Sequence, residues 1–234
     1  MSFRLTPYES LPSTSTLLTG LAAQGEPEGL AILARRQTAG RGTQGRDWES
    51  PAGNLHLSVL LRPTAPLREA PQWALLAAVA LHQAAGPHTR LKWPNDLMLG
   101  GAKAGGILAE TAATPDGRID WLVLGFGVNL AHAPSLPGRA TAALGPEPPE
   151  DFAARLLDAL AQWHRTRLHE GFAPIRAAWM AAGPAPDSHL SILQASRRIA
   201  GRYAGLSEDG GLMLATAGRV HTLHVGEVAD AAGH

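Results

Sequence analysis

The sequence predicts an α/β fold of the α+β type, in which helices pack on a mixed β-sheet, followed by a small β-barrel. Helical and strand-like patterns alternate up to about residue 182, and residues 119–128 are apolar on both faces after Asp120, as in a central strand. After Gly183-Pro-Ala-Pro186, short strand-like pieces and turns replace helices. The chain of 234 residues has room for one or two domains at roughly 100–200 residues each. We place them at 1–184 and 185–234.

The spacing of apolar residues predicts each element of the first domain. The expected order is a helix over 14–24, a strand over 29–37, a Gly-rich loop over 38–53, a strand over 54–62, a helix over 66–85, short strands near 90–93, 96–100 and 104–111, a strand over 119–128, a Pro-rich connector over 134–149, and helices near 150–170 and 172–182. Ser13-Thr14-Ser15 supplies hydroxyls that open the first helix, and Gly86-Pro87 ends the second. In that second helix, apolar residues recur at intervals of three and four. Gly100-Gly101 provides a turn between two of the short strands.

The composition excludes several classes of protein. Apolar residues make up 45% and charged residues 17% of the chain, which excludes disordered and fibrous proteins. No apolar run approaches the length of a membrane span and no signal peptide is recognisable, so we expect a cytoplasmic protein. The absence of cysteine removes disulfides, thiolate nucleophiles and Cys-based zinc sites. The formal net charge of zero offers no case for a nucleic-acid partner.

The segment 38–53, here called the Arg-Gly loop, is the first candidate for ligand binding. Its sequence Gly40-Arg-Gly-Thr-Gln-Gly-Arg46 matches G-x-G-x-x-G, but a strand follows it, whereas a dinucleotide-binding fingerprint needs a helix there. Counting Arg35 and Arg36, four arginines fall within twelve positions. Clustered guanidinium groups suit a carboxylate or phosphates. A solvated surface loop explains this segment equally well when it is taken alone.

The second candidate contains the two lysines of the chain, Lys92 and Lys103, among 18 arginines. Glycines flank Lys103 on both sides, so its ammonium group can reach a phosphate or a carboxylate while the backbone stays close. Asp96 offers a hard oxygen that suits Mg²⁺ held jointly with phosphates. Chance placement of the lysines, and a simple turn capped by Asn95 and Asp96, are the plainer alternatives.

A third candidate is the strand end Gly125-Phe-Gly-Val-Asn129. The two glycines share one face of the strand, which leaves that face open to a flat ligand, and the amide of Asn129 can read polar edges. Close packing of a central strand against a helix would explain the same glycines.

Together these segments resemble the biotin protein ligases, also called holocarboxylase synthetases, over nearly the whole chain. The matching motifs are Ser13-Thr14-Ser15, Gln37-Thr-Ala-Gly-Arg-Gly42, Lys92-Trp-Pro-Asn-Asp96, Lys103-Ala-Gly-Gly-Ile-Leu-Ala-Glu110, Gly125-Phe-Gly-Val-Asn129 and His224-Val-Gly-Glu-Val228. The second and third motifs at this separation are specific, whereas either alone is weak. The chain departs from the family pattern at Thr43, where Arg is frequent, and at Ser15, where Asn is common.

The resemblance implies a catalytic domain like those of class II synthetases and a C-terminal SH3-like barrel. It also implies a two-step reaction, in which biotin and ATP give biotinyl-5′-adenylate and pyrophosphate, and a lysine of the biotin carboxyl carrier protein of acetyl-CoA carboxylase then takes the biotinyl group. Biotin and ATP are therefore the expected substrates, Mg²⁺ the expected metal, and the carrier protein the expected partner of a monomer or homodimer. Since the first motif begins at residue 13, a monofunctional enzyme without an N-terminal DNA-binding domain is expected.

The resemblance also assigns the site residue by residue. Catalysis is expected from Lys103 and Arg41, and a possible magnesium contact from Asp96. Biotin is expected to bind Ser13, Thr14, Ser15, Gln37, Gly40, Arg41, Gly42, Thr43, Lys103, Gly105 and Gly106. ATP is expected to bind Arg41, Arg46, Trp48, Lys92, Asn95, Asp96, Lys103 and Asn129. The Arg-Gly loop is expected to close as a lid, with Trp48 either stacked on adenine or anchoring the loop.

Two alternatives stay open from the sequence. Lipoate ligases and octanoyl transferases resemble the same fold, but they lack this combination of an Arg-Gly loop with Lys-Trp-Pro-Asn-Asp. A non-catalytic sensor of biotin or its adenylate is the other alternative, and the presence of both Lys92 and Lys103 counts against it.

Overall fold

A computed structural model describes residues 1–194 and 197–229 of the chain. Within these ranges the strands form a seven-stranded sheet of order β1-β2-β3-β7-β6-β5-β4 and a five-stranded sheet of order β11-β10-β9-β8-β12. The strands of the large sheet are β1 (Arg4–Tyr8), β2 (Leu30–Ala34), β3 (Leu55–Leu61), β4 (Thr89–Lys92), β5 (Asp96–Leu99), β6 (Ala102–Ala113) and β7 (Ile119–Val128). Strands β1 and β2 are parallel and the other neighbours are antiparallel, so the predicted mixed sheet is confirmed.

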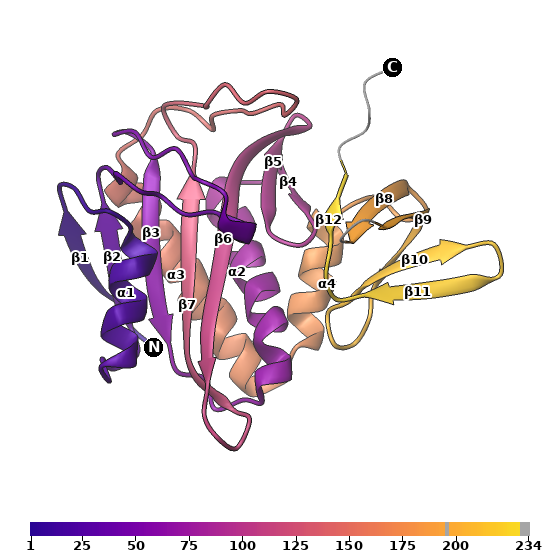
Figure 1. The fold of residues 1–234 in the computed structure, drawn as a ribbon, viewed down its shortest axis with the longest axis horizontal. Coiled ribbons are helices and arrows are strands. Elements are labelled where there is room, and N and C mark those ends of the chain that lie inside the picture. The colour runs from indigo at the N-terminus through magenta and orange to yellow at the C-terminus, as the bar shows by residue number, and fades with distance from the viewer. Residues whose placement is uncertain (195–196, 230–234) are drawn as a thin grey trace.

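Helices cover both faces of the large sheet (Figure 1). They are α1 (Thr14–Ala23), α2 (Ala70–Ala85), α3 (Pro149–Glu170) and α4 (Ala173–Ala182). Helix α1 packs on one face through Leu18, against Ile32, Leu60 and Val123. Helices α2, α3 and α4 bury the larger apolar cluster on the other face. Strand β3 lies within the predicted range of 54–62, and both of its faces are buried because helices or loops cover each side.

The structure differs from the sequence prediction by one additional strand and at several boundaries. Strand β1 was not predicted, because Pro7 and its mostly exposed side chains give this edge strand no apolar pattern. Strand β2 ends at Ala34 rather than at residue 37. The residues between Ala34 and the Arg-Gly loop are therefore not part of the strand. The second helix begins at Ala70 rather than at residue 66, after a 3₁₀ turn over Leu67–Glu69.

The second sheet consists of β8 (His189–Gln194), β9 (Arg197–Leu206), β10 (Leu212–Thr216), β11 (Arg219–Leu223) and β12 (Glu227–Val228). These strands fit the expected SH3-like unit. They form a five-stranded sheet, and no ladder joins β11 to β12 within the described ranges, so closure into a barrel is not seen. Buried side chains such as Ile192 and Leu206 continue the apolar core of the large sheet. The boundary at residue 184, between α4 and β8, stays a prediction, and residues 195–196 and 230–234 of the second unit lie outside the described residues.

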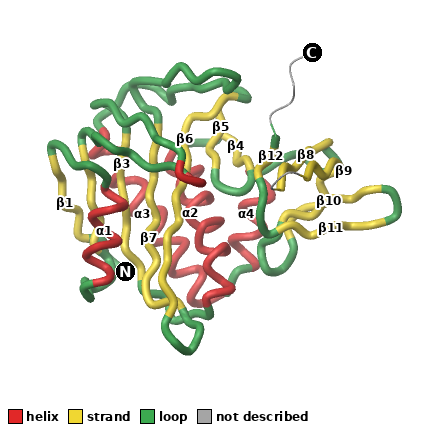
Figure 2. Tube along the Cα trace, viewed as in Figure 1, coloured by secondary structure: helices red, strands yellow, loops and turns green. Residues whose placement is uncertain are grey.

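The loops that carry the motifs gather at one end of the large sheet. Figure 2 shows the loop after β2 and the connector after β7 running over the same edge. One hydrogen bond joins these two loops to each other, from the amide of Ala131 to the carbonyl of Gly53, and another joins the connector to β6, from the amide of Lys103 to the carbonyl of Ala140. In the described part of the chain, no helix is long and apolar enough to cross a membrane.

Candidate functional site

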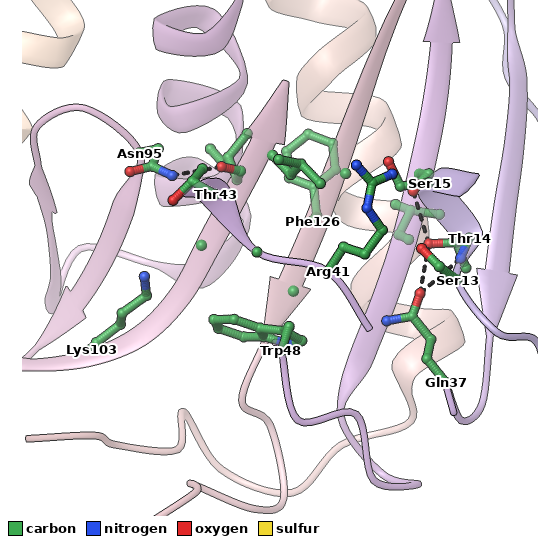
Figure 3. Close-up of a pocket in the computed structure, with 18 residues that line it drawn as sticks. Ser13, Thr14, Ser15, Gln37, Arg41, Thr43, Trp48, Asn95, Lys103 and Phe126 are labelled. Carbon is green, nitrogen blue, oxygen red and sulfur yellow. Dashed lines mark hydrogen bonds between the residues drawn. The ribbon is translucent and has the colours of Figure 1, made fainter. Parts of the chain in front are cut away.

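A cavity lies where α1, the Arg-Gly loop and the strands β3, β6 and β7 meet (Figure 3). Its empty volume is about 470 Å³, partly open to solvent. The lining residues are Ser13, Thr14, Ser15, Gln37, Arg41, Gly42, Thr43, Trp48, Leu57, Ser58, Asn95, Lys103, Gly106, Ile107, Leu108, Gly125, Phe126 and Gly127. The fold thus brings most of the residues predicted for biotin to one pocket, together with an apolar wall that the sequence analysis did not name.

The polar end of this cavity is built from hydroxyl and amide groups with fixed partners. Ser13 caps α1, its side chain accepting from the amide of Thr16. The amide and hydroxyl of Thr14 both donate to Oε1 of Gln37, at 2.8 and 3.1 Å. The amide group of Gln37 in turn donates to Ser50 Oγ at 2.8 Å. These bonds hold the cavity wall in one arrangement before any ligand arrives.

Arg41 and Ser15 both contact the carboxylate of Glu110, a residue that was not among the predicted site residues. Arg41 Nη2 lies 2.7 Å from Oε1 of Glu110, and its Nη1 lies 3.3 Å from Oε2. The hydroxyl of Ser15 donates to the same carboxylate. Strand alternation could have found Glu110, because it shares the face of β6 with Gly106. Glu110 therefore orients Arg41 and compensates its charge.

Lys103 stands at the other end of the cavity. Its Nζ lies 2.5 Å from Asp96 Oδ1 and 5.5 Å from the centre of the Trp48 ring. Asn95 donates through Nδ2 to the carbonyl of Ile107 at 2.7 Å. The Lys103 side chain is 23% exposed, so its ammonium is only partly hydrated. A partly desolvated cation of this kind interacts more strongly with an anionic ligand than one in bulk water.

The indole of Trp48 lies against part of the glycine face of β7. A Cβ atom placed on Gly127 would lie 2.5 Å from the indole of Trp48, and one placed on Gly106 would lie 3.5 Å from it. Gly125 and Gly127 both line the first cavity, but at Gly127 the flat group that lies against this face is the Trp48 ring. Trp48 packs on the strand and also lines the cavity, so stacking on adenine and anchoring of the loop both stay predictions; its buried Nε1 has no hydrogen-bond partner among the described residues.

A second, larger cavity adjoins the first and shares Asn95 and Lys103 with it. Its lining is strongly charged, with four basic side chains (Arg46, Lys92, Lys103 and Arg139) and two carboxylates (Asp96 and Glu227). Arg46 forms an ion pair with Glu227 of β12 and donates to the carbonyl of Thr43 at 3.2 Å. The excess of cations over carboxylates suits a polyanion such as a phosphate chain.

Three predicted residues lie in the walls rather than on either cavity. A Cβ on Gly40 would lie 2.3 Å from the carbonyl oxygen of Trp48, and one on Gly105 would lie 3.1 Å from the carbonyl oxygen of Gly127. Asn129 is 1% exposed and donates to the carbonyl of Ala142 at 3.1 Å. These residues position the backbone around the site, and the sequence motif did not distinguish that role from ligand contact.

His56 lies in β3, opposite Gly127 of β7. Its Nε2 is 3.1 Å from the carbonyl oxygen of Pro51, at the end of the Arg-Gly loop. Burial lowers the pKa of His56 below its ordinary value, more than the backbone hydrogen bond raises it. The imidazole is thus neutral near pH 7 and acts as a wall residue.

Comparison with known proteins places this geometry in a family. A sequence profile of the Biotin/lipoate A/B protein ligase family matches residues 8–129. The chain is 37% identical over 199 residues to a biotin–[acetyl-CoA-carboxylase] ligase of Paracoccus denitrificans, which covers 78% of this chain and 82% of that one. It is 33% identical over 236 residues to the enzyme of the same name from Mycobacterium tuberculosis, with 92% and 85% covered.

The fold agrees with these sequence relatives. The structure of the biotin protein ligase of Aquifex aeolicus in complex with biotin and ATP is similar over 97% of both chains, with a TM-score of 0.81 and 24% sequence identity. The resemblance inferred from the motifs is thereby confirmed, and this chain belongs to the biotin/lipoate A/B protein ligase family.

Proposed function

We propose that this chain is a biotin protein ligase, which activates biotin with ATP and transfers it to a lysine of the biotin carboxyl carrier protein of acetyl-CoA carboxylase. The observation that carries the proposal is the junction between the two cavities, where Lys103 and Asn95 line both. A carboxylate from the first cavity and a phosphate from the second would meet there. The similar proteins are named as biotin ligases, which disfavours a lipoate ligase and a mere sensor.

In the first step, a carboxylate oxygen of biotin forms a bond to the α-phosphorus of ATP. The bond from that phosphorus to the bridging oxygen of the β-phosphate breaks, and pyrophosphate leaves with the electron pair. Negative charge gathers at the junction, where the ammonium of Lys103 stabilises the transition state by position and charge. Arg41 lines the first cavity alone, so its guanidinium would act from the biotin side. This step needs no protein nucleophile, in accord with a chain that has no cysteine.

The two carboxylates next to these cations support this assignment. Asp96 contacts Lys103 and Glu110 contacts Arg41, so each carboxylate holds its cation at the wall of the cavity. A side chain held in this way loses less conformational entropy when it binds an anion. The carboxylate of biotin and the α-phosphate can then share these cations with Asp96 and Glu110.

Magnesium fits the second cavity as an ion that arrives with the nucleotide. Within the described residues, no three His, Cys, Asp or Glu side chains come together as a ready-made metal site. Mg²⁺ commonly takes one or two carboxylates together with substrate phosphates. Asp96 is the residue that would hold it, and the ion would offset phosphate charge.

In the second step, the amine of the carrier lysine attacks the acyl carbon of the adenylate and loses a proton, and AMP leaves. The adenylate reacts readily with water, so the site must exclude water until the carrier docks. The Arg-Gly loop, with Trp48 packed on β7, forms part of the cavity wall and would supply that protection by closing over bound ligand. The proposal includes a cytoplasmic location and involves neither nucleic acid nor a membrane.

The test is direct. Purified protein is incubated with biotin, ATP and Mg²⁺, pyrophosphate is measured, and biotin incorporation into a carrier domain is followed, with a carrier lacking its acceptor lysine as control. Octanoate and lipoate replace biotin in parallel reactions. Pyrophosphate release and lysine-dependent incorporation with biotin alone are expected. Turnover of lipoate or octanoate instead, or biotin binding without pyrophosphate release, would contradict the proposal.

A further inference from the structure

The connector between β7 and α3 carries one exposed arginine, Arg139, to the edge of the second cavity. Its neighbours are held firmly. The amide of Lys103 donates to the carbonyl of Ala140 and the amide of Ala142 donates to the carbonyl of Lys103, each at 2.9 Å. Gly138, with a φ of +71°, makes the turn just before it. The backbone at Arg139 is therefore fixed beside that of Lys103.

The charge balance of the cavity leaves Arg139 uncompensated. Of the two carboxylates in the lining, Asp96 binds Lys103 and Glu227 binds Arg46. Within the described ranges, no carboxylate lies at ion-pair distance from the guanidinium of Arg139. An arginine that lines a cationic cavity without a carboxylate of its own can bind an anionic ligand without first breaking a salt bridge.

The position also indicates which part of a nucleotide would meet it. Arg139 lines the second cavity and is not part of the lining of the first, where Ser13, Gln37 and Arg41 lie. In the proposed reaction the α-phosphate sits at the junction beside Lys103. The leaving phosphates must then extend from that junction into the second cavity, since biotin occupies the first.

We infer that Arg139 binds the β- and γ-phosphates of ATP and thus the pyrophosphate that leaves. This inference rests on the proposed function, because it concerns the leaving group of that reaction. The planar fork of a guanidinium matches two phosphate oxygens at once, which a lysine ammonium cannot do. Arg139 therefore stabilises the departing group from the connector while Lys103 acts at the α-phosphorus.

The experiment runs adenylate formation in reverse, from biotinyl-5′-adenylate and pyrophosphate to biotin and ATP. Arg139→Gln, Arg139→Lys and a matched control, Arg118→Gln, are compared with the wild type. Arg118 is likewise an exposed arginine at a turn, at the opposite end of the β6–β7 pair. Transfer of biotin from preformed adenylate to the carrier is measured in the same proteins, because that step involves no pyrophosphate.

Arg139→Gln should raise the half-saturating concentration of pyrophosphate about fivefold, the effect of losing one charge-assisted contact at an exposed site. Arg139→Lys should recover part of the loss, and Arg118→Gln should match the wild type. All three should transfer preformed adenylate at the wild-type rate. An unchanged pyrophosphate requirement in Arg139→Gln, or an equal defect in transfer, would overturn the inference. A wild-type protein that makes no ATP would instead refute the proposed function.

Discussion

Replacement of Lys103 by glutamine is expected to stop adenylate formation almost completely while leaving the fold intact. The ammonium contacts Asp96 at 2.5 Å and lies 5.5 Å from the Trp48 ring, at the junction of the two cavities. Both partners of the ion pair are about one-fifth exposed. A partly exposed pair of this kind contributes only about 0–1 kcal/mol to stability after solvent screening. The melting temperature should therefore shift by a few degrees at most.

The effect on rate is far larger, because the charge acts on the transition state. Loss of one electrostatic contact to a developing anion costs about 2–4 kcal/mol, or roughly 30- to 1000-fold in rate. Lys103→Arg should also be impaired, since the ammonium is a compact point charge held beside Asp96 and close to Gly106. A longer, planar guanidinium does not place its charge at the same point, so conservation of charge alone does not restore the geometry.

The assay is single-turnover release of pyrophosphate at saturating biotin and ATP, with thermal unfolding measured on the same samples. A Lys103→Gln protein with a wild-type melting curve and a rate within threefold of wild type would refute the role of Lys103. A variant that fails to fold would show a collapsed melting curve and is thereby recognised. Transfer from preformed adenylate provides a second readout, and it should fall less than adenylate formation does.

Four further results are expected. Trypsin cleavage in the Arg-Gly loop between Arg41 and Trp48 should be suppressed by biotin plus ATP, and equal digestion with and without ligands would contradict closure of this loop. Thr43→Arg should slow dissociation of biotinyl-adenylate and Arg41→Gly should hasten it, as followed by stopped-flow release; identical rates in all three proteins would show that charge in the loop does not retain the intermediate. Gly127→Ala should force Trp48 off β7, because the new Cβ would lie 2.5 Å from the indole, and should cost about 1–3 kcal/mol in urea unfolding together with a shift in tryptophan fluorescence. The pKa of His56 is lowered by burial, so the unfolded chain takes up the proton first and stability should fall as the pH drops below 6.5, by at most about 1.4 kcal/mol per pH unit; urea titrations of the wild type and of a His56→Gln variant at several pH values test this slope.

Most of the fold could be predicted because the spacing of apolar residues indicates which segments are helices and which are strands. The apolar spacing of α2, the long apolar run of β7 and the glycine turn between β5 and β6 each report local structure. Strand β1 could not be found in this way. It pairs with β2 at an edge, where Pro7 and mostly exposed side chains remove the apolar signal.

The sequence predicted which residues form the candidate site better than it predicted which side chains contact one another there. The motifs identified Lys103 and Arg41. Glu110, which orients Arg41, could be found only by noting that alternate residues of β6 share the face of Gly106. The pairing of Arg46 with Glu227 joins residues 181 positions apart, and no local pattern reports such a contact. The covering of Gly127 by Trp48 likewise depends on how the loop folds back, which composition does not determine.

The ion pair between Arg46 and Glu227 ties the Arg-Gly loop to the second sheet, and this has a thermodynamic consequence. If binding of a ligand draws Arg46 away from Glu227, the second sheet is held less tightly. The ion pair weakens ligand binding by the same free energy, because coupling between two equilibria is reciprocal. The two side chains are 34% and 32% exposed, so the coupling is limited to about 1 kcal/mol, or roughly fivefold in affinity. The second sheet can therefore adjust how tightly the loop holds its ligand, but it cannot switch binding on or off.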